Sequence, residues 1–173
     1  MELAVSEKVW KTRPYEVSDK DACLRIFDEN TPQYFLPNER QDFSTYLDEQ
    51  TGCHFVVENE GGALIACGGY ATGWPDEGSA TLCWGMVGKD WHGLGVGRLL
   101  LILRLAALCQ VPEIKMVRMD TSQRSVGFFM KWGFKTFRIT RDHYGPNLHR
   151  YEMRLSLDED KKREISNTAG SKE

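Results

Sequence analysis

Long hydrophobic runs are missing from this sequence, and its longest apolar stretch, residues 99–109, is interrupted by Arg104. That stretch is too short to cross a bilayer, which takes about 20 apolar residues. Residues 1–10 also lack the apolar core of a signal peptide. We therefore expect a cytoplasmic protein with no membrane partner.

The sequence also lacks an excess of charge and any paired cysteine motif. Its net charge is −3, so it has no basic footprint for nucleic acid. No two cysteines have the CxxC spacing of a metal or redox site, and His54, His143 and His149 show no metal-ligand spacing. We expect no metal, and we expect all five cysteines to be reduced, small core residues. The five are Cys23, Cys53, Cys67, Cys83 and Cys109.

What is present is a composition typical of one globular domain, with 173 residues of which 41% are apolar. Hairpin signals come first and a βαβ-like unit follows, which predicts the α/β (α+β) class with a mixed sheet of about seven strands and about four helices. The polar tail, 158–173, is predicted to be disordered. The expected strands are 13–17, 54–58, 63–71, 80–87, 114–119, 134–140 and 149–157, and the expected helices begin at Ser18, after Asn38, at Leu99 and at Thr121 or Ser122.

The most informative segment is 91–98, WHGLGVGR, which lies between a predicted strand and a predicted apolar helix. Alternate glycines there leave backbone N–H groups unobstructed at the positive end of the helix dipole, which is a typical phosphate site. A tight turn with close helix packing is the alternative interpretation. Three alternate glycines exceed what a turn requires, which favours a ligand.

A dinucleotide is the first candidate ligand. Gly93-Leu94-Gly95 begins a G-x-G-x-x-G pattern, but Arg98 stands at the third glycine position. Five residues separate Val87 from Gly93, whereas the dinucleotide turn follows its strand directly. The hypothesis of a nicotinamide-dependent oxidoreductase is therefore supported by Asp120 alone, which would bind the ribose. The P-loop is excluded because no Gly-Lys-Ser/Thr follows the glycines.

The arrangement instead resembles the GNAT superfamily of acetyl-CoA-dependent N-acyltransferases. Its first motif is Gln/Arg-x-x-Gly-x-Gly/Ala after a strand ending in Val, and this chain has 92–97, HGLGVG, after Val87. Its second is Leu-Tyr-x-Lys-x-Gly-Phe, and this chain has 128–134, FFMKWGF. The resemblance covers residues 10–157 and leaves an N-terminal extension, 1–9. A closer resemblance, to an uncharacterised bacterial group of the superfamily, is carried by 26–28, 120–122 and 144–146.

The resemblance implies that acetyl-CoA is held by three parts of the chain. The backbone of the glycine turn would hold the pyrophosphate, the end of the preceding strand would pair with the pantetheine arm, and Ser122 would lie beside that arm. A helix N-cap is the alternative role for Ser122. The expected cofactor-binding residues are Met86, Val87, His92, Gly93, Leu94, Gly95, Val96, Gly97, Arg98, Ser122 and Phe129.

The resemblance also implies direct attack by an amine on the thioester, which calls for a base and an acid. The family's usual acid is the tyrosine of the second motif, but Phe129 cannot donate a proton. Tyr144 is the substitute candidate acid, and Asp120 is the candidate base. Their alternative roles are an aromatic residue on a turn and a helix-capping acid. The expected acceptor pocket comprises Tyr34, Phe35, Glu39 and Trp74, although loop aromatics often cover a core edge instead.

The resulting hypothesis is an N-acetyltransferase that acts on a primary amine of a small molecule or peptide, with no metal and no nucleic acid. Phe129 motivates the alternative, a non-catalytic acyl-CoA-binding or sensor module. A homodimer, common in the superfamily, is an open expectation. The identity of the amine does not follow from the sequence.

Overall fold

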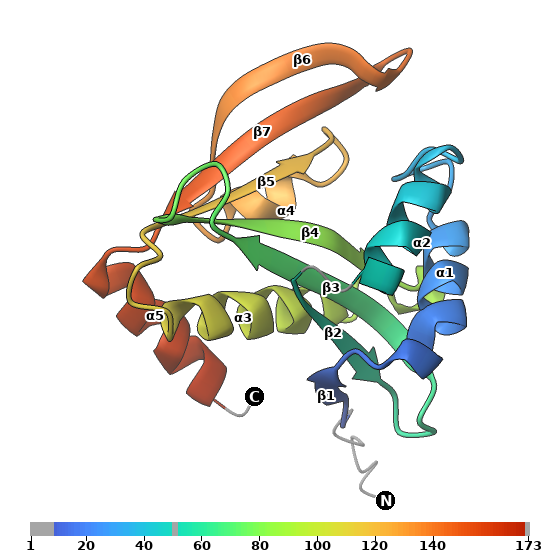
Figure 1. Ribbon diagram of the computed structural model, residues 1–173, viewed down its shortest axis with the longest axis horizontal. Coiled ribbons are helices and arrows are strands. Elements are labelled where there is room, and N and C mark those ends of the chain that lie inside the picture. The colour runs from blue at the N-terminus through green and yellow to red at the C-terminus, as the bar shows by residue number, and fades with distance from the viewer. Residues whose placement is uncertain (1–8, 50–51, 172–173) are drawn as a thin grey trace, which may run out of the picture.

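The computed structural model describes residues 9–49 and 52–171, which form a central sheet with helices on both faces (Figure 1). The strands of the described part are β1 (Lys11–Pro14), β2 (Cys53–Glu58), β3 (Leu64–Thr72), β4 (Ser79–Val87), β5 (Met116–Thr121), β6 (Lys135–Gly145) and β7 (Leu148–Ser156). The α-helices are α1 (Lys20–Glu29), α2 (Glu39–Glu49), α3 (Val96–Cys109), α4 (Val126–Met130) and α5 (Glu159–Gly170), and short 3₁₀ turns cover Val17–Asp19 and Lys89–Trp91.

The sheet has seven strands in the order β1-β2-β3-β4-β5-β7-β6. All neighbouring strands are antiparallel except β4 and β5, which are parallel. This confirms the expected single α/β domain with a mixed sheet. The parallel pair is a consequence of α3, which returns the chain to the same edge of the sheet after β4.

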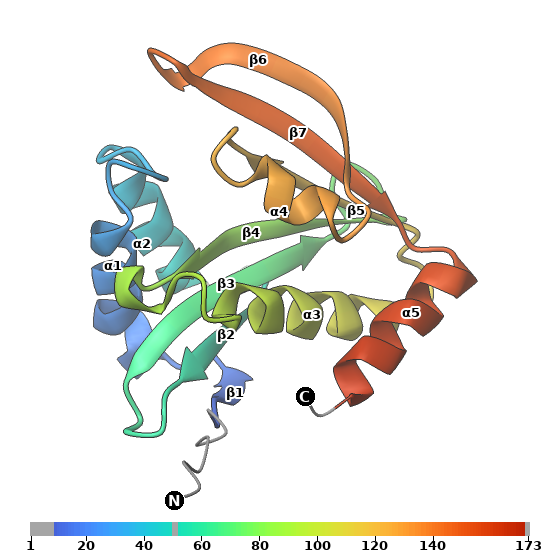
Figure 2. The same ribbon diagram turned by 180° about the vertical axis from the view of Figure 1, so that it is seen from behind.

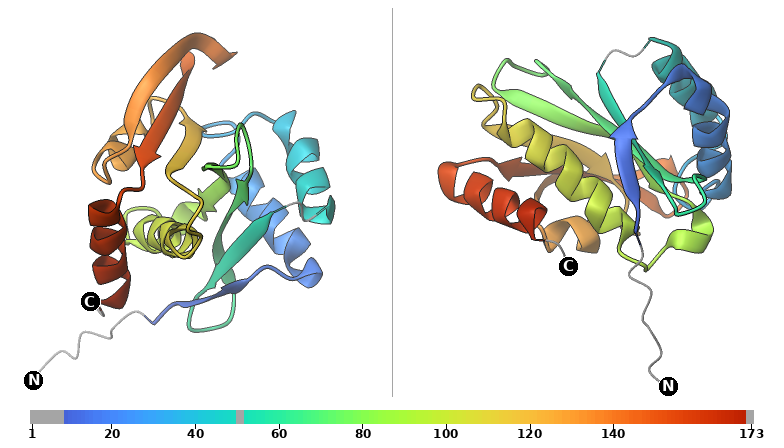
Figure 3. Two further views of the ribbon diagram at one scale, coloured as in Figure 1. Left: turned by 60° about the vertical axis from the view of Figure 1, so that its left-hand side comes forward. Right: turned by 90° about the horizontal axis from the view of Figure 1, so that it is seen from below.

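Successive residues of a central strand serve the two faces of the sheet. Val56 packs with Phe27 and Phe43 of α1 and α2, while Val57, its neighbour, packs with Leu100 of α3. Both valines are fully buried because side chains alternate across a strand and both faces are covered. Figures 2 and 3 show α1 and α2 on one face and α3 with α5 on the other.

The parallel contact between β4 and β5 is short. It joins Ser79, Ala80 and Thr81 to Met116, Val117 and Arg118, and the paired register ends there. β4 continues to Val87 and β5 to Thr121, so the two strands diverge (Figure 1). The sheet therefore opens between them, and one backbone edge of β4 is left beside the gap.

The C-terminal tail corrects one prediction, because residues 159–170 form a helix rather than a disordered end. Asp158 caps it by accepting a hydrogen bond from Lys161 N at 2.8 Å. Ile165 is 3% exposed and packs in the core cluster that includes Leu108 of α3. The polar composition of the tail gave no sign that Ile165 is buried and that Asp158 caps the helix, and these two residues stabilise it.

Other boundaries differ by smaller amounts. The helix expected from Thr121 or Ser122 begins at Val126, because Ser122 forms a turn whose carbonyl accepts from the N–H groups of Ser125 and Val126. β6 extends to Gly145, five residues beyond the expected 140. Residues 1–8 of the expected N-terminal extension lie outside the described residues. Within the described ranges, no helix is long and apolar enough to cross a membrane.

Candidate active site

A cavity of about 560 Å³ occupies the opening between β4 and β5. Its walls come from the divergent halves of those two strands, the glycine turn and first turns of α3, α4, the segment between α1 and α2, and Tyr144 of β6. It therefore collects segments that lie far apart in the sequence. Because β4 loses its β5 partner beside this cavity, backbone hydrogen-bonding groups of β4 are available to an extended ligand there.

The glycine turn forms one end of the cavity. Gly93 and Gly95 have positive φ angles of 74° and 91°, which explains glycine at both positions. Gly97 has neither a positive φ nor a crowded site, since a Cβ there would lie 3.7 Å from Val87 Cγ2. Gly95 is the N-cap of α3, has no side chain to cap the helix and lines the cavity, so the positive end of the helix dipole lies beside the cavity. These features fit an anionic ligand.

Two side chains fix the end of β4 through a single backbone oxygen. The Val87 carbonyl accepts from Asn30 Nδ2 at 2.9 Å, and His92 Nε2 lies 2.8 Å from the same oxygen. Asn30 is 4% exposed and also donates to the Ile26 carbonyl. With its carbonyl held on this side, Val87 keeps a defined backbone orientation beside the cavity.

β4 carries a bulge in the cavity wall. Cys67 pairs with Met86 and Gly69 with Cys83, so Trp84 and Gly85 lie opposite the single residue Gly68. Trp84 has φ of 50°, an uncommon conformation for an aromatic residue. Such bulges turn backbone groups away from the ladder and are frequent beside active sites.

Arg104 lies behind this bulge as a buried cation. It is 4% exposed, and a Cβ on Gly85 would come within 2.8 Å of its guanidinium, so glycine makes room for it. Its Nε donates to the Leu100 carbonyl at 3.1 Å, and no carboxylate of the described residues pairs with it. Burial lowers the pKa of Arg104 to about 10, which still leaves it charged at neutral pH.

The α4 side of the cavity contains the second family motif. Ser122 is buried, and its Oγ accepts from Arg124 N at 3.3 Å in the turn before α4, but the N-cap of that helix is Ser125, so the alternative capping role for Ser122 is wrong. Phe129 lines the cavity while packing edge-on against Phe128 and Phe134. The ring is therefore part of the wall and supplies no polar group.

Asp120 and Tyr144 both line the cavity. Arg150 Nη2 lies 3.0 Å from Asp120 Oδ2, yet burial outweighs this pairing and raises the pKa of Asp120 above its ordinary value. The pKa of Tyr144 is raised to about 12, first by burial and next by the charge of Asp120. The carboxylate is thus made more basic, and the phenol stays protonated at neutral pH.

The expected acceptor pocket is assembled in part. Tyr34, Phe35 and Glu39 line the cavity, and Glu39 Oε2 also accepts from Leu36 N at 2.7 Å. Trp74 does not line it; the prediction for this residue is wrong. Trp74 lies in the loop between β3 and β4 with 67% exposure, because that loop leaves the sheet at the opposite end of β4.

Two residues of the glycine turn also lie off the cavity wall. Leu94 is 41% exposed, and Val96 is fully buried in the cluster between α3 and the sheet. The other predicted cofactor-binding residues all line the cavity; these are Met86, Val87, His92, Gly93, Gly95, Gly97, Arg98, Ser122 and Phe129.

Sequence reasoning missed Asn30, Cys83, Trp84 and Arg104, which all line the cavity. Arg104 gave a signal, because a charge interrupted an otherwise apolar helix. Asn30 gave none, because its partner Val87 lies far along the chain.

Residues 21–134 match the family model described as Acetyltransferase (GNAT) family. The chain belongs to the GNAT acetyltransferase family. No curated protein matches this GNAT chain. Its fold is similar to that of the ribosomal-protein-S18-alanine N-acetyltransferase from Escherichia coli, with 17% identity, a TM-score of 0.74 and coverage of 87% of this chain and 95% of that one.

Two further solved structures share the GNAT fold with this chain. The spermidine/spermine N-acetyltransferase SpeG from Vibrio cholerae has 13% identity and a TM-score of 0.67, covering 92% of this chain and 98% of that one. The yncA protein from Salmonella typhimurium, solved with acetyl-CoA, has 15% identity and a TM-score of 0.71, covering 87% and 95%. At these identities the likeness supports the fold and leaves the acceptor open.

Proposed function

We propose that this GNAT protein transfers the acetyl group of acetyl-CoA to a primary amine of a small molecule or peptide. The observation that carries the proposal is the opening between β4 and β5, which joins an unpaired strand edge to the glycine turn in one cavity. A strand edge suits an extended amide-containing arm, and a helix start suits a pyrophosphate. Acetyl-CoA contains both groups in one molecule.

The chain's own residues supply binding and orientation for this reaction. The backbone of Gly93, Gly95 and Gly97 would hold the pyrophosphate beside the positive charge of Arg98. β4 near Met86 and Val87 would align the pantetheine arm, with Asn30 and His92 keeping that backbone in place. A backbone N–H at the β4 bulge would polarise the thioester carbonyl.

Asp120 and Tyr144 are the proposed proton-transferring groups. The attacking amine loses a proton as its nitrogen bonds to the acetyl carbon, and the carbon–sulfur bond to CoA breaks as the thiolate leaves. Asp120 accepts that proton through water, since its raised pKa makes it a stronger base than an ordinary carboxylate. Tyr144 remains protonated and is able to protonate the thiolate.

A second candidate function is an acyl-CoA sensor without turnover. Two observations favour it: Phe129 places a ring where the family uses a phenol, and Arg150 pairs with Asp120. The positive charge of Arg150 stabilises the ionised form of Asp120 and so opposes the effect of burial that makes this carboxylate a better proton acceptor. The two functions share the binding site and differ only in catalysis.

The first test is a thermal-shift titration with acetyl-CoA, run beside CoA and NAD. A ligand at about 100 times its Kd stabilises the fold by roughly 2.7 kcal/mol, which is a readily measured shift. We expect acetyl-CoA and CoA to raise Tm and NAD to leave it unchanged. If neither CoA compound raises Tm at millimolar concentration, the proposed cofactor site is contradicted.

Catalysis is tested separately by thiol release in the presence of a panel of diamines, amino acids and peptides. We expect release that depends on both acetyl-CoA and one class of amine. Binding of acetyl-CoA without acetylation of any reactive amine, even in a single-turnover experiment, would favour the sensor instead.

A further inference from the structure

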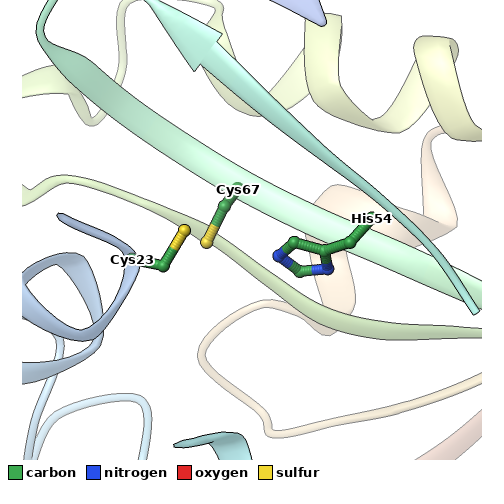
Figure 4. A group of neighbouring side chains, drawn as sticks. All are labelled: Cys23, His54 and Cys67. Atoms are coloured by element: carbon green, nitrogen blue, oxygen red, sulfur yellow. The ribbon is translucent and has the colours of Figure 1, made fainter. Parts of the chain in front are cut away.

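Three metal-ligating side chains meet in the core between α1 and the sheet, away from the cavity wall. Cys23 of α1, His54 of β2 and Cys67 of β3 each place a ligand atom within 4.8 Å of those of the other two. Both cysteines are fully buried and His54 is 8% exposed. Figure 4 shows the two sulfur atoms facing each other and one ring nitrogen of His54 turned towards them.

His54 has one nitrogen without a partner. Its Nδ1 lies 3.4 Å from the Tyr46 hydroxyl, which fixes the ring, and its buried Nε2 has no hydrogen-bond partner among the described residues. A buried polar atom without a hydrogen-bond partner destabilises the folded protein. An imidazole whose far nitrogen is held by a hydrogen bond is the arrangement that orients metal-binding histidines.

Tyr15 adds a second orphaned atom to the same place. Its ring lies edge-on to His54 with centroids 5.6 Å apart, and its buried hydroxyl has no partner among the described residues. The surrounding core is apolar, with Phe27, Phe43 and Val56 in the same cluster as the two cysteines. Water is thus excluded from a group of four polar side chains, two of which need a partner.

We propose that Cys23, Cys67 and His54 Nε2 bind one structural Zn²⁺ ion. Two thiols and an imidazole are typical zinc ligands, and a tetrahedral zinc ion takes one further ligand beside these three. Coordination forms two zinc–sulfur bonds and releases one proton from each thiol. The resulting two thiolates balance the charge of the ion, which allows the centre to exist in an apolar core.

The proposed ion ties α1 to the β2–β3 hairpin. It lies behind the cavity, since His54 contacts Tyr46, and Cys83, which lines the cavity, lies 3.3 Å from the Tyr46 hydroxyl. Because the site is enclosed, zinc would enter as the chain folds. The inference stands independently of acetyl transfer.

The test uses the full chain purified under reducing conditions from zinc-supplemented medium. Elemental analysis is expected to find about one zinc per chain. Refolding with Co²⁺ instead should give the intense near-ultraviolet charge-transfer bands of cobalt–thiolate bonds.

Variants separate this site from the other cysteines. Cys67→Ala and His54→Ala are expected to lower zinc affinity at least about 10-fold and to weaken the cobalt bands. The matched control is Cys53→Ser, which removes an exposed thiol next to His54 and should change neither measurement. Circular dichroism checks that the variants fold. If a variant does not fold, the zinc content and cobalt bands of the wild-type protein test the proposal.

Three outcomes would overturn the proposal. The first is wild-type protein that contains no stoichiometric metal and gives no cobalt–thiolate bands. The second is bands that persist unchanged in folded Cys67→Ala. The third is a Cys23–Cys67 disulfide in protein never exposed to oxidant, seen as the loss of two hydrogens in mass.

Discussion

Among single residues, Asp120 has the environment that bears most directly on acetyl transfer. It lies at the end of β5 on the cavity wall, opposite Glu152 in the β5–β7 ladder and paired with Arg150. Burial raises its pKa above the ordinary value despite the arginine. A carboxylate on the cavity wall whose pKa lies above the ordinary value is a candidate proton acceptor.

We predict that Asp120→Asn lowers kcat/KM for the amine by about 10²-fold or more, the range typical of a lost general base. In the wild type, log(kcat/KM) should fall on the acidic side with an apparent pKa above that of a free aspartate, and the variant should lose this limb. A raised folded-state pKa means that the ionised form opposes folding at neutral pH, so Tm should not fall.

Asp160→Asn is the control for this prediction, because Asp160 is an exposed aspartate of α5 that lies outside the cavity wall. Its kcat/KM and pH profile should match those of the wild type. An Asp120→Asn variant that keeps wild-type turnover and pH dependence would mean that another group takes the proton.

Among the elements, α3 is the helix whose start meets the proposed ligand. Gly93 and Gly95 are explained by their positive φ angles, so any side chain there strains the turn itself. Gly97 is different: it lies in the first turn of the helix, lines the cavity and has room for a methyl group. Glycine at this position is therefore not required by the fold.

We predict that Gly97→Ala raises stability and weakens acetyl-CoA binding at the same time. Alanine gains about 0.4–1 kcal/mol by restricting the unfolded chain. Its methyl group projects towards Val87 and Phe128 in the cavity, where it would meet the pyrophosphate. Thermal melts without ligand and calorimetric titration with acetyl-CoA measure the two effects separately.

Gly127→Ala is a matched control, since Gly127 is the second residue of α4, as Gly97 is of α3, and has open space around it. It lies off the cavity wall, so it should change stability without changing affinity. Equal affinities in Gly97→Ala and the wild type would place the pyrophosphate elsewhere.

Local patterns predicted the elements well wherever the cause is local. The glycine turn, the hairpin at 60–62 and the apolar helix α3 were predicted because their residues carry turn chemistry or continuous hydrophobicity. Helix α5 was not, because its order depends on Ile165 reaching a core that the tail's polar composition does not reveal. The same limit hid Asn30, whose partner Val87 lies far along the chain.

For the whole molecule, the sheet consists of two parts joined by three residue pairs. β1 to β4 form one part and β5 to β7 the other, and pairing between them is confined to Ser79–Thr81 and Met116–Arg118. The seven-stranded mixed sheet was predicted from the order of elements. The divergence of β4 from β5 has no counterpart in the sequence, because strand separation leaves no pattern in one chain; the family resemblance implied only that the end of this strand pairs with the pantetheine arm.

We predict that acetyl-CoA slows amide hydrogen exchange in residues 82–87, where β4 has no β5 partner. Backbone groups there would gain a ligand in place of a neighbouring strand. Hydrogen-exchange mass spectrometry with and without acetyl-CoA measures this, and peptides from β2 serve as the internal control because both edges of that strand are already paired. Protection limited to the glycine turn would contradict the strand-like mode of binding.

The brief junction between β4 and β5 also has a consequence for how the chain folds. β2, β3 and β4 are joined by short loops and β6 pairs with β7 through a tight hairpin, whereas α1 and α2 separate β1 from β2, and α4 and β6 separate β5 from β7. Short loops cost little entropy and form quickly. The three-pair parallel contact requires α3 to be in place first. Folding of this domain should therefore begin in β2–β4 and in the β6–β7 hairpin, and the joining of these two units across α3 should set the overall rate.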